Sequence, residues 1–566
     1  MPSNSSSTQA SSNLRTGGQI LVDCLKLHGV DTVFCVPGES YLATLDAFHD
    51  AQDAINLVVC RQEGGVTNMA DAYGKMTGRP GIAFVTRGPG ATNASVGIHT
   101  AHQDSTPLIL FVGQVGRDMT EREAFQEVDY RRFFGEMTKW VAQIDNAERI
   151  PEMVSRAFHV ATSGRPGPVV LALPEDMQKD RADAEDGQRY RSAQAHPGAD
   201  NMSQFRKMLA AAKNPFLLVG GGGWSEGACA DLRTFVENNN LPVAAAFRRQ
   251  DLLDNRHPNY AGVVGLGLDP SLKKRLDETD LLIALGPQLG EIVTGGYTYF
   301  TLPRPRQPLI HIAAGVDELG KIYQADLAIN AGMTEFCAAA ADMKPVDASA
   351  WEKGTELAHA DYLDYSSPKP MPGAVNYSEI VSKLSATLPD DTIVTNGAGN
   401  YTVWVHRFWR YKKYGTQLAP QSGAMGYGVP SGTAAGLRYK DRIVLSFNGD
   451  GCFQMNGQEI GTAVQEGAKT IFIVINNGIY GTIRMHQERE YPKRVSGTHL
   501  HNPDFAALAR AYGAHGETVE KTEDFDAAFE RCRAAHGPSL IEIRIESDAV
   551  LPTNTLSAIQ KAALGD

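Results

Sequence analysis

The stretch GDGCFQMNGQEIGTAVQEGAKTIFIVINN, residues 449 to 477, decides how this chain of 566 residues folds. It begins where an apolar run, Ile443 to Phe447, ends close to a carboxylate, Asp450, that stands between two glycines. A helix-length segment leads into a second apolar run, Thr470 to Ile475, which ends on two asparagines, the second being Asn477. This order of strand, crossover helix and strand predicts two neighbouring parallel strands. The polar residues that follow the two strands should then lie at the same edge of the sheet.

Asp450 and Asn477 carry oxygen atoms that suit a divalent cation. Mg²⁺ prefers such oxygens and commonly bridges to phosphate groups. The flanking glycines let a ligand approach the backbone, whose N–H groups can hold a diphosphate. Asn456 is expected to cap the following helix, with Glu459 as its capping-box partner. A Gly-Asp-Gly tripeptide alone is more often a plain turn, so the strands on both sides carry the prediction of a metal-diphosphate site.

Composition and charge are those of an ordinary globular protein. Apolar residues make up 42% of the chain and charged residues 21%, and a net charge of -12 argues against a nucleic-acid or anionic-membrane surface. The seven cysteines show no CxxC spacing, which predicts neither a disulfide framework nor a zinc site. We therefore expect a cytoplasmic protein that binds small molecules, with no nucleic acid and no membrane among its partners.

Apolar runs alternate with helix-length segments along the whole chain, a pattern typical of α/β domains with parallel sheets. The predicted strands lie at 33–36, 55–60, 81–86, 108–112, 215–219, 242–246, 281–285, 309–313, 392–395, 443–447, 470–475 and 540–545. The predicted units are a disordered tail (1–14), a first domain (15–190), a central domain (200–345), an irregular linker (346–374), a third domain (375–550) and a C-terminal tail (551–566).

The 449–477 stretch resembles the thiamine diphosphate motif of the superfamily that contains pyruvate decarboxylase and acetohydroxyacid synthase. Residues 15–550 match that pattern through CRQEGG (60–65), TRGPGATN (86–93), AHQDSTPL (101–108), AFQE (124–127), GRPGPVVLALPEDM (164–177), TNGAGNY (395–401) and SGAMGYGVP (422–430). The resemblance implies three doubly wound α/β domains in series, pyrimidine-binding, central and diphosphate-binding, with mainly parallel six-stranded sheets. The pattern is most similar to the large subunit of acetohydroxyacid synthase.

The resemblance also implies how thiamine diphosphate and Mg²⁺ are held. The metal ligands would be the side chains of Asp450 and Asn477 and the backbone carbonyl of Ile479. Gly451 and Cys452 would donate backbone N–H groups to the diphosphate. Because only the Cys452 backbone is used, a cysteine in place of the usual serine is expected to matter little.

Glu63 is the catalytic residue that the resemblance implies, since the family places a glutamate there against N1′ of the aminopyrimidine. Met425 would hold the two rings of the cofactor in a bent V, and the Gly423 carbonyl would accept from the 4′-amino group. Read alone, Glu63 is also a favourable helix-start carboxylate and Met425 is ordinary core filler. The remaining cofactor-binding residues that we predict are Gly399, Asn400, Tyr401, Gly449, Tyr480 and Gly481.

The activity implied is a decarboxylase or carboligase acting on pyruvate or a related 2-oxo acid, similar to acetolactate synthase. Two alternatives remain: a carbon-carbon lyase of the benzaldehyde lyase or 2-hydroxyacyl-CoA lyase type, and a non-catalytic relative that keeps the fold. In the family, the glutamate and the metal-binding aspartate come from different chains. A homodimer is therefore the smallest expected active unit, and a homotetramer is usual.

Two departures from the synthase pattern concern its other ligands. Gln288 and Leu289 stand where the synthase has an arginine in its FAD-binding central domain, which argues against FAD here. His486 stands where the synthase has a substrate-selecting tryptophan. The substrate-site candidates are Gly38, Glu39, Arg87, Phe125, Gln126, Arg484 and His486. Arg87 and Arg484 suit a carboxylate, although a structural ion pair is about equally expected.

Overall fold

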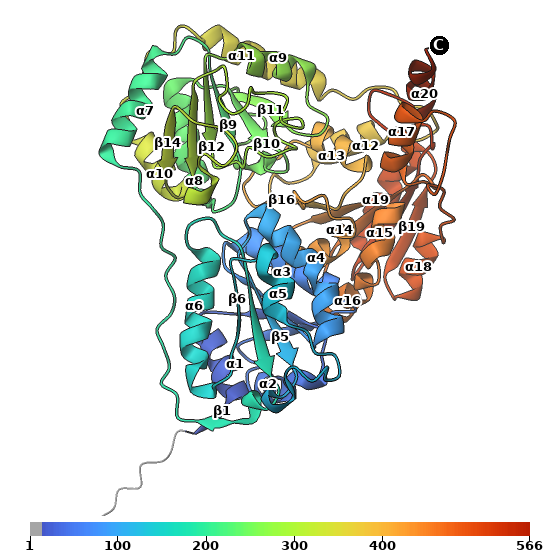
Figure 1. The fold of residues 1–566 in the computed structure, drawn as a ribbon. Helices are drawn as coiled ribbons and strands as arrows, with labels where there is room; N and C mark the ends of the chain where they lie inside the picture. Colours follow the sequence, from blue (N-terminus) through green and yellow to red (C-terminus); the bar gives the residue numbers. More distant parts are fainter. Residues whose placement is uncertain (1–13, 566) are drawn as a thin grey trace, which may run out of the picture.

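Three α/β domains follow one another in the computed structural model, which describes residues 14–565 (Figure 1). Each domain is built on a six-stranded sheet, and every strand pair in these sheets is parallel. The predicted fold class is confirmed. The predicted disordered tail falls almost wholly on residues outside the described range.

The first domain has the strand order β3-β2-β4-β5-β7-β6. Its strands are β2 (Thr32–Cys35), β3 (Asn56–Val59), β4 (Gly81–Val85), β5 (Leu108–Gln114), β6 (Trp140–Gln143) and β7 (Pro168–Pro174). Its helices are α1 (Gly17–Leu27), α2 (Leu42–His49), α3 (Glu63–Thr77), α4 (Gly88–Asp104), α5 (Tyr130–Phe134) and α6 (Ile150–Thr162). A short antiparallel pair, β1 (Arg15–Thr16) and β8 (Arg181–Ala182), joins the two ends of the domain.

The central domain has the order β11-β10-β9-β12-β13-β14, that of a dinucleotide-binding sheet. Its strands are β9 (Pro215–Val219), β10 (Val243–Ala246), β11 (Tyr260–Val264), β12 (Leu281–Leu285), β13 (Leu309–Ala313) and β14 (Leu327–Asn330). Its helices are α7 (Ala199–Ala211), α8 (Glu226–Asn239), α9 (Pro270–Glu278), α10 (Met333–Ala341) and α11 (Glu352–Tyr365).

The third domain repeats the topology of the first, with the order β16-β15-β17-β18-β20-β19. Its strands are β15 (Ile393–Asn396), β16 (Gln417–Leu418), β17 (Val444–Gly449), β18 (Ile471–Asn476), β19 (His515–Val519) and β20 (Ser539–Arg544). Its helices are α12 (Tyr377–Thr387), α13 (Tyr401–Phe408), α14 (Gly428–Arg438), α15 (Asp450–Asn456), α16 (Glu459–Glu466), α17 (Gly481–Glu490), α18 (Phe505–Ala511), α19 (Phe525–Ala534) and α20 (Leu556–Leu564).

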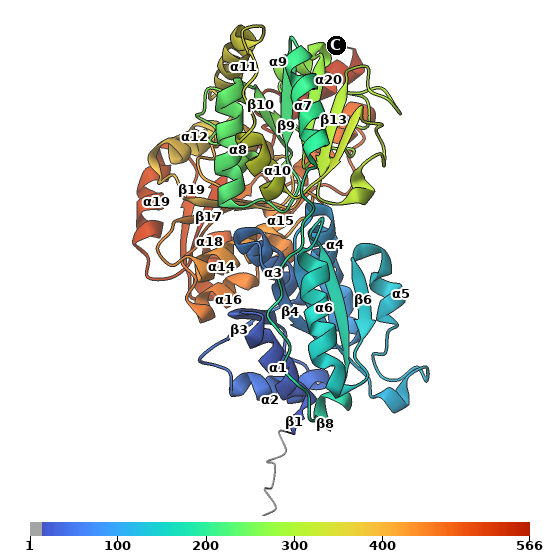
Figure 2. The same ribbon diagram turned by 90° about the vertical axis from the view of Figure 1, so that its left-hand side faces the viewer.

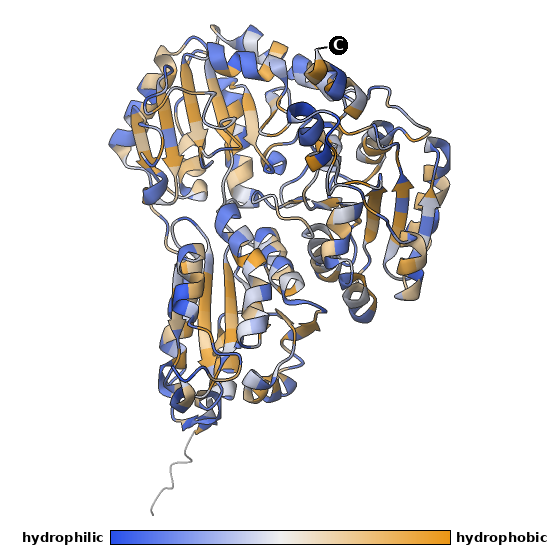
Figure 3. Ribbon diagram, turned by 45° about the vertical axis from the view of Figure 1, so that its right-hand side comes forward, coloured by the Kyte–Doolittle hydropathy of each residue, from blue (hydrophilic) through white to orange (hydrophobic). Residues whose placement is uncertain are grey.

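The sheets are mainly apolar, as Figure 3 shows by the mostly orange colour of their inner strands. Every residue of β5 and of β7 is buried. A parallel sheet covered by helices on both sides needs such continuous apolar runs, because no strand residue faces water. Among residues 14–565, no helix is long and apolar enough to cross a membrane, and all seven cysteines are free thiols.

The segments predicted as an irregular linker and as a C-terminal tail each contain a helix. The expected linker contains α11, whose Tyr362 is buried edge-to-face against Tyr260, with ring centroids 4.9 Å apart. The expected C-terminal tail contains α20, which begins at the N-cap Thr555 and buries Ile559 against α17. The packing of Tyr362 and of Ile559 against neighbouring elements therefore stabilises these two helices.

The first and third domains pack against each other within the chain, and the central domain lies against both (Figures 1 and 2). Helices α3 and α14 form the contact between the first and third domains. Lys75 on α3 is buried between Asp71 and Asp104, and the Tyr427 hydroxyl donates to Asp71 at 2.6 Å. Buried charges are tolerated when they are paired and hydrogen-bonded, so this cluster fixes how the two domains meet.

Candidate active site

A cavity of about 240 Å³ opens at the point where the strand order of the third-domain sheet reverses. From β15, the chain order runs outward to β16 on one side and to β17 on the other. The loops that leave β15 and β17 therefore diverge and leave a crevice at the carboxyl ends of the strands, the usual ligand site of such sheets. This position follows from the topology alone.

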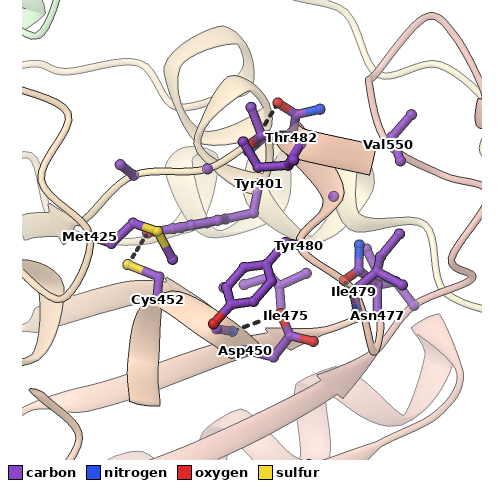
Figure 4. A pocket seen from close by; sticks show the side chains of 18 of the residues that line it. Tyr401, Met425, Asp450, Cys452, Ile475, Asn477, Ile479, Tyr480, Thr482 and Val550 are labelled. Atoms are coloured by element: carbon purple, nitrogen blue, oxygen red, sulfur yellow. Dashed lines mark hydrogen bonds between the residues drawn. The ribbon is translucent and has the colours of Figure 1, made fainter. Parts of the chain in front are cut away.

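All predicted cofactor-binding residues except Glu63 line this cavity. They are Gly399, Asn400, Tyr401, Gly423, Met425, Gly449, Asp450, Gly451, Cys452, Asn477, Ile479, Tyr480 and Gly481. Figure 4 shows Met425 and Cys452 on one side and Asn477 and Ile479 on the other, with Asp450 between them. The structure thus brings together residues from four separate stretches of sequence.

Asp450 is held at the end of β17 by donors from the neighbouring loop. One oxygen of its carboxylate accepts from the Gly451 N–H at 2.9 Å. The other accepts from the Gly478 N–H at 2.9 Å and from Asn502 Nδ2 at 2.8 Å. Burial raises the pKa of Asp450, while these hydrogen bonds favour its ionised form. No Lys, Arg or His forms an ion pair with Asp450 within residues 14–565, so its charge is available to a cation.

Asn502 is a site residue that the sequence did not reveal. Its Nδ2 donates both to Asp450 and, at 2.8 Å, to Asn476 Oδ1, so it links the ends of β17 and β18. It comes from the irregular segment between α17 and α18 and belongs to no motif. Only the fold places it beside Asp450.

Apart from Asp450 itself, the oxygen atoms here that could bind a cation belong mostly to neutral groups. Asn477 follows β18 directly, and its Oδ1 accepts from the Ile479 N–H at 3.3 Å. Among the described residues there is no group of three His, Cys, Asp or Glu side chains that could hold a metal. One carboxylate with amide and carbonyl oxygens suits a hard cation that keeps part of its shell for water or phosphate.

Cys452 makes hydrogen bonds through its side chain, whereas the expectation that its identity matters little assumed a role for its backbone alone. Its Sγ accepts from the Tyr401 hydroxyl at 3.4 Å and from the Gly426 N–H at 3.2 Å. The Tyr401 hydroxyl in turn accepts from the Gly397 N–H at 3.0 Å. The thiol thus joins the loop after β15 to the loop that carries Met425.

The predicted capping box at Asn456 and Glu459 is wrong. Asn456 is the last residue of α15, and its Nδ2 donates to the Gly426 carbonyl at 3.1 Å. The buried carboxylate of Glu459 accepts from the N–H groups of Arg61 and Gln62, both at 3.0 Å. Both side chains therefore form hydrogen bonds with residues distant in sequence instead of capping a helix. Through its two bonds, Glu459 fixes the backbone that leads into Glu63.

The burial of Glu459 predicts how the stability of the folded protein depends on pH. Burial raises the pKa of Glu459, so the folded chain binds this proton more tightly than the unfolded chain does. Its contribution to stability is therefore full below the ordinary carboxyl range and is lost as pH rises through the raised value. The melting temperature of the wild type minus that of Glu459→Gln should fall as the pH rises above the ordinary glutamate pKa of about 4.3. A difference in melting temperature that stays constant or grows with pH would show that burial does not raise the pKa of Glu459.

Glu63 lies away from the cavity of its own chain. It is the first residue of α3, and its Oε2 accepts from Asn93 Nδ2 at 2.9 Å on α4. It is half-buried on the first domain, and it is not among the residues that line the cavity. Glu63 and Asp450 therefore do not share a site within one chain.

The first-domain substrate candidates gather at the equivalent switch point of the first sheet. Gly38 and Glu39 follow β2, while Arg87 follows β4. The Gly88 N–H donates to the Gln126 carbonyl at 2.9 Å, which draws the loop of Phe125 and Gln126 to the same edge. None of these residues lines the third-domain cavity.

The two arginines predicted to hold a carboxylate are both neutralised by partners. Arg87 Nη2 lies 2.6 Å from Glu175 Oε2, and Arg484 Nη2 lies 2.8 Å from Glu488 Oε1. These contacts favour a structural ion pair over substrate binding for both arginines. His486 is exposed and lines a second, larger cavity to which all three domains contribute residues.

Comparisons with known proteins show to which family the chain is similar. Three domain families match: the N-terminal TPP binding domain of thiamine pyrophosphate enzymes at residues 15–133, the central domain at 202–340 and the C-terminal TPP binding domain at 397–543. The chain is 31% identical over 536 residues to the acetolactate synthase isozyme 2 large subunit of Escherichia coli, covering 94% of this chain and 95% of that protein.

Two further relatives are similar over most of the chain. The acetolactate synthase large subunit of Corynebacterium glutamicum is 32% identical over 553 residues, covering 94% of this chain and 87% of that protein. The mitochondrial acetolactate synthase catalytic subunit of Saccharomyces cerevisiae is 30% identical over 565 residues, covering 95% of this chain and 82% of that protein.

Proposed function

Because the chain belongs to the thiamine pyrophosphate enzymes, we propose that it is a carboligase of the acetolactate synthase type, which joins pyruvate or a related 2-oxo acid to a second one. The observation that carries this proposal is the cavity itself. It unites an unpaired buried carboxylate, an amide side chain and glycine backbone at the switch point of the third sheet.

The residues around Asp450 fit a metal-bound diphosphate. Asp450, the Asn477 side chain and the Ile479 carbonyl would hold Mg²⁺, and the N–H groups of Gly451 and Cys452 would donate to the diphosphate. The glycines leave room: a Cβ on Gly451 would lie 2.5 Å from the Tyr480 ring, so a side chain there would collide with the cavity wall. When bound, thiamine diphosphate supplies a nucleophilic carbon that takes up and releases an acyl group.

Glu63 and Met425 would tune and orient the cofactor. Met425 presents a partly buried apolar side chain to the cavity and can support the angle between two rings. Glu63 would share a proton with N1′ of the aminopyrimidine, and the Asn93 amide fixes the direction of its carboxylate. Since Glu63 lies outside the cavity of its own chain, a second copy would supply it. We therefore propose a homodimer as the active unit and a homotetramer as its usual assembly.

The central domain is proposed to work without FAD. Arg165 is paired with the buried Glu318 at 2.7 Å. Gln288 faces the same guanidinium, and with its amide flipped its side-chain oxygen accepts from Arg165 Nε at 2.9 Å. These contacts occupy the region where the synthase pattern has an arginine for FAD. No step of the reaction that we propose depends on the central domain binding a cofactor.

An assay of the full-length protein with Mg²⁺ and thiamine diphosphate tests the function. A panel of 2-oxo acids is supplied singly and in pairs, and CO₂ and the condensation product are measured. We expect CO₂ release from pyruvate or a close relative, with a 2-hydroxy-3-oxo acid as product. Cleavage of an acyloin or a 2-hydroxyacyl thioester without CO₂ release would favour a lyase instead. Silence on every substrate, with the cofactor bound, would support a non-catalytic relative.

A further inference from the structure

A buried arginine without an anionic partner lines the second cavity. Arg248 is only 4% exposed and lies in the loop after β10. Its Nη1 donates to the Pro420 carbonyl, and its Nε has no hydrogen-bond partner within the described chain. No carboxylate within residues 14–565 forms an ion pair with it. A buried cation in this condition is costly, and an anion brought by a ligand would offset that cost.

The backbone and the neighbouring ring hold Arg248 in place. Its φ of +62° lies in the left-handed region, which a side chain other than glycine seldom adopts. The guanidinium carbon stands 4.7 Å from the centre of the Phe247 ring. Burial lowers the pKa of Arg248, but a guanidinium stays charged at physiological pH. Strained backbone of this kind is concentrated at functional sites.

The second cavity, of about 830 Å³, continues into the cofactor cavity. Ala398, Gly399, Asn400, Gly423 and Thr482 line both. A small molecule beside Arg248 could therefore reach the space between Met425 and the loop after β15. Arg87 and Arg484 are neutralised by carboxylates, whereas Arg248 is a buried cation that remains open to a substrate.

We propose that the Arg248 guanidinium binds the carboxylate of the acceptor 2-oxo acid and so selects an anionic acceptor over a neutral aldehyde. The inference rests on the carboligase function proposed above. The acceptor is the better ligand because its carboxylate remains in the product. A cation held on the donor carboxylate would stabilise the ground state and oppose loss of CO₂.

The test compares two acceptors in the holoenzyme. With the same 2-oxo acid as donor, Arg248→Gln is expected to lower kcat/KM for a 2-oxo acid acceptor by about 100-fold, since a charge-assisted pair is lost. Its kcat/KM for a neutral aldehyde acceptor should stay within about threefold of the wild type. Arg248→Lys should recover part of the loss, because the charge returns without the planar fork. Equal losses with both acceptors, or none with either, would overturn the proposal.

A binding measurement separates this proposal from the carboligase function. Oxamate, an unreactive analogue of a 2-oxo acid, is titrated calorimetrically into the protein loaded with thiamine diphosphate and Mg²⁺. We expect the wild type and Arg249→Gln to bind it, and Arg248→Gln to bind at least about tenfold more weakly. Arg249 is the matched control because its Nη2 donates to the Asp104 carbonyl at 2.7 Å, beside a different cavity.

Each result of that titration bears on Arg248 directly. Oxamate binding that depends on Arg248 would support the proposal even if no carboligation were found, and that absence would count against the proposed function alone. Equal binding by the wild type and Arg248→Gln, or no binding by the wild type, would reject Arg248 as the carboxylate receptor.

Discussion

Replacing Asp450 with alanine is expected to abolish binding of thiamine diphosphate and with it all turnover. Asp450 is the one carboxylate in the proposed metal set, and it also orders the loops after β17 and β18 through Gly478 and Asn502. Outer-shell changes at metal sites already weaken binding by about 10-fold to 100-fold, so loss of a charged ligand should cost at least about 100-fold. Calorimetric titration of the apoprotein with cofactor at fixed Mg²⁺ measures this.

The matched control for that variant is Asp391→Asn. Asp391 precedes β15 at the amino end of the same sheet, where its carboxylate lies 3.7 Å from Arg442. Removing a charge there should leave cofactor affinity within about twofold, since surface ion pairs contribute little. Tight cofactor binding by Asp450→Ala, in a protein with an unchanged melting temperature, would show that Asp450 does not hold the metal.

Glu63→Gln should behave in the opposite way, keeping the cofactor and losing turnover. Glutamine fits the same space beside Asn93 but cannot exchange a proton with N1′, and general acid-base catalysis of this kind contributes about 10²-fold to 10⁴-fold. We expect kcat to fall by that amount while cofactor affinity changes by less than about threefold. Steady-state kinetics and calorimetry on one preparation give both numbers.

Asp46→Asn serves as the control for Glu63→Gln. Asp46 is an exposed carboxylate on α2 of the same domain, outside the proposed site. It should retain wild-type kcat. If Glu63→Gln retained it as well, proton sharing between Glu63 and the cofactor would have no part in the reaction.

The sequence predicted the inner strands of the three sheets better than the outer ones. β12 is an unbroken apolar run, β13 is apolar except for His311, and the predicted bounds of both agree with the observed ones. The edge strands β6, β11, β14 and β19 were missed, as was the two-residue β16, because edge strands are short and carry polar or small residues. The inner strand β7 was missed too, although all of its residues are buried.

The two halves of the site differ in how well they could be predicted. The residues around Asp450 follow directly from strand ends, so a local motif locates them. Asn502 and Arg248 come from loops remote in sequence, and no motif marks them. Arg87 looked open to a substrate until the fold supplied Glu175 as its partner. Partners of this kind depend on tertiary structure, which a single sequence does not display.

The proposed mechanism requires one cofactor to be held by Asp450 of one chain and tuned by Glu63 of another. Coexpression of Glu63→Gln chains with Asp450→Ala chains tests this directly, since each variant alone should be inactive. A mixed dimer would contain one site with both residues intact, so random assembly should restore activity to about a quarter of the sites. Activity near that level is the predicted result. No activity from the mixture, with mixed dimers shown to form, would contradict the shared site.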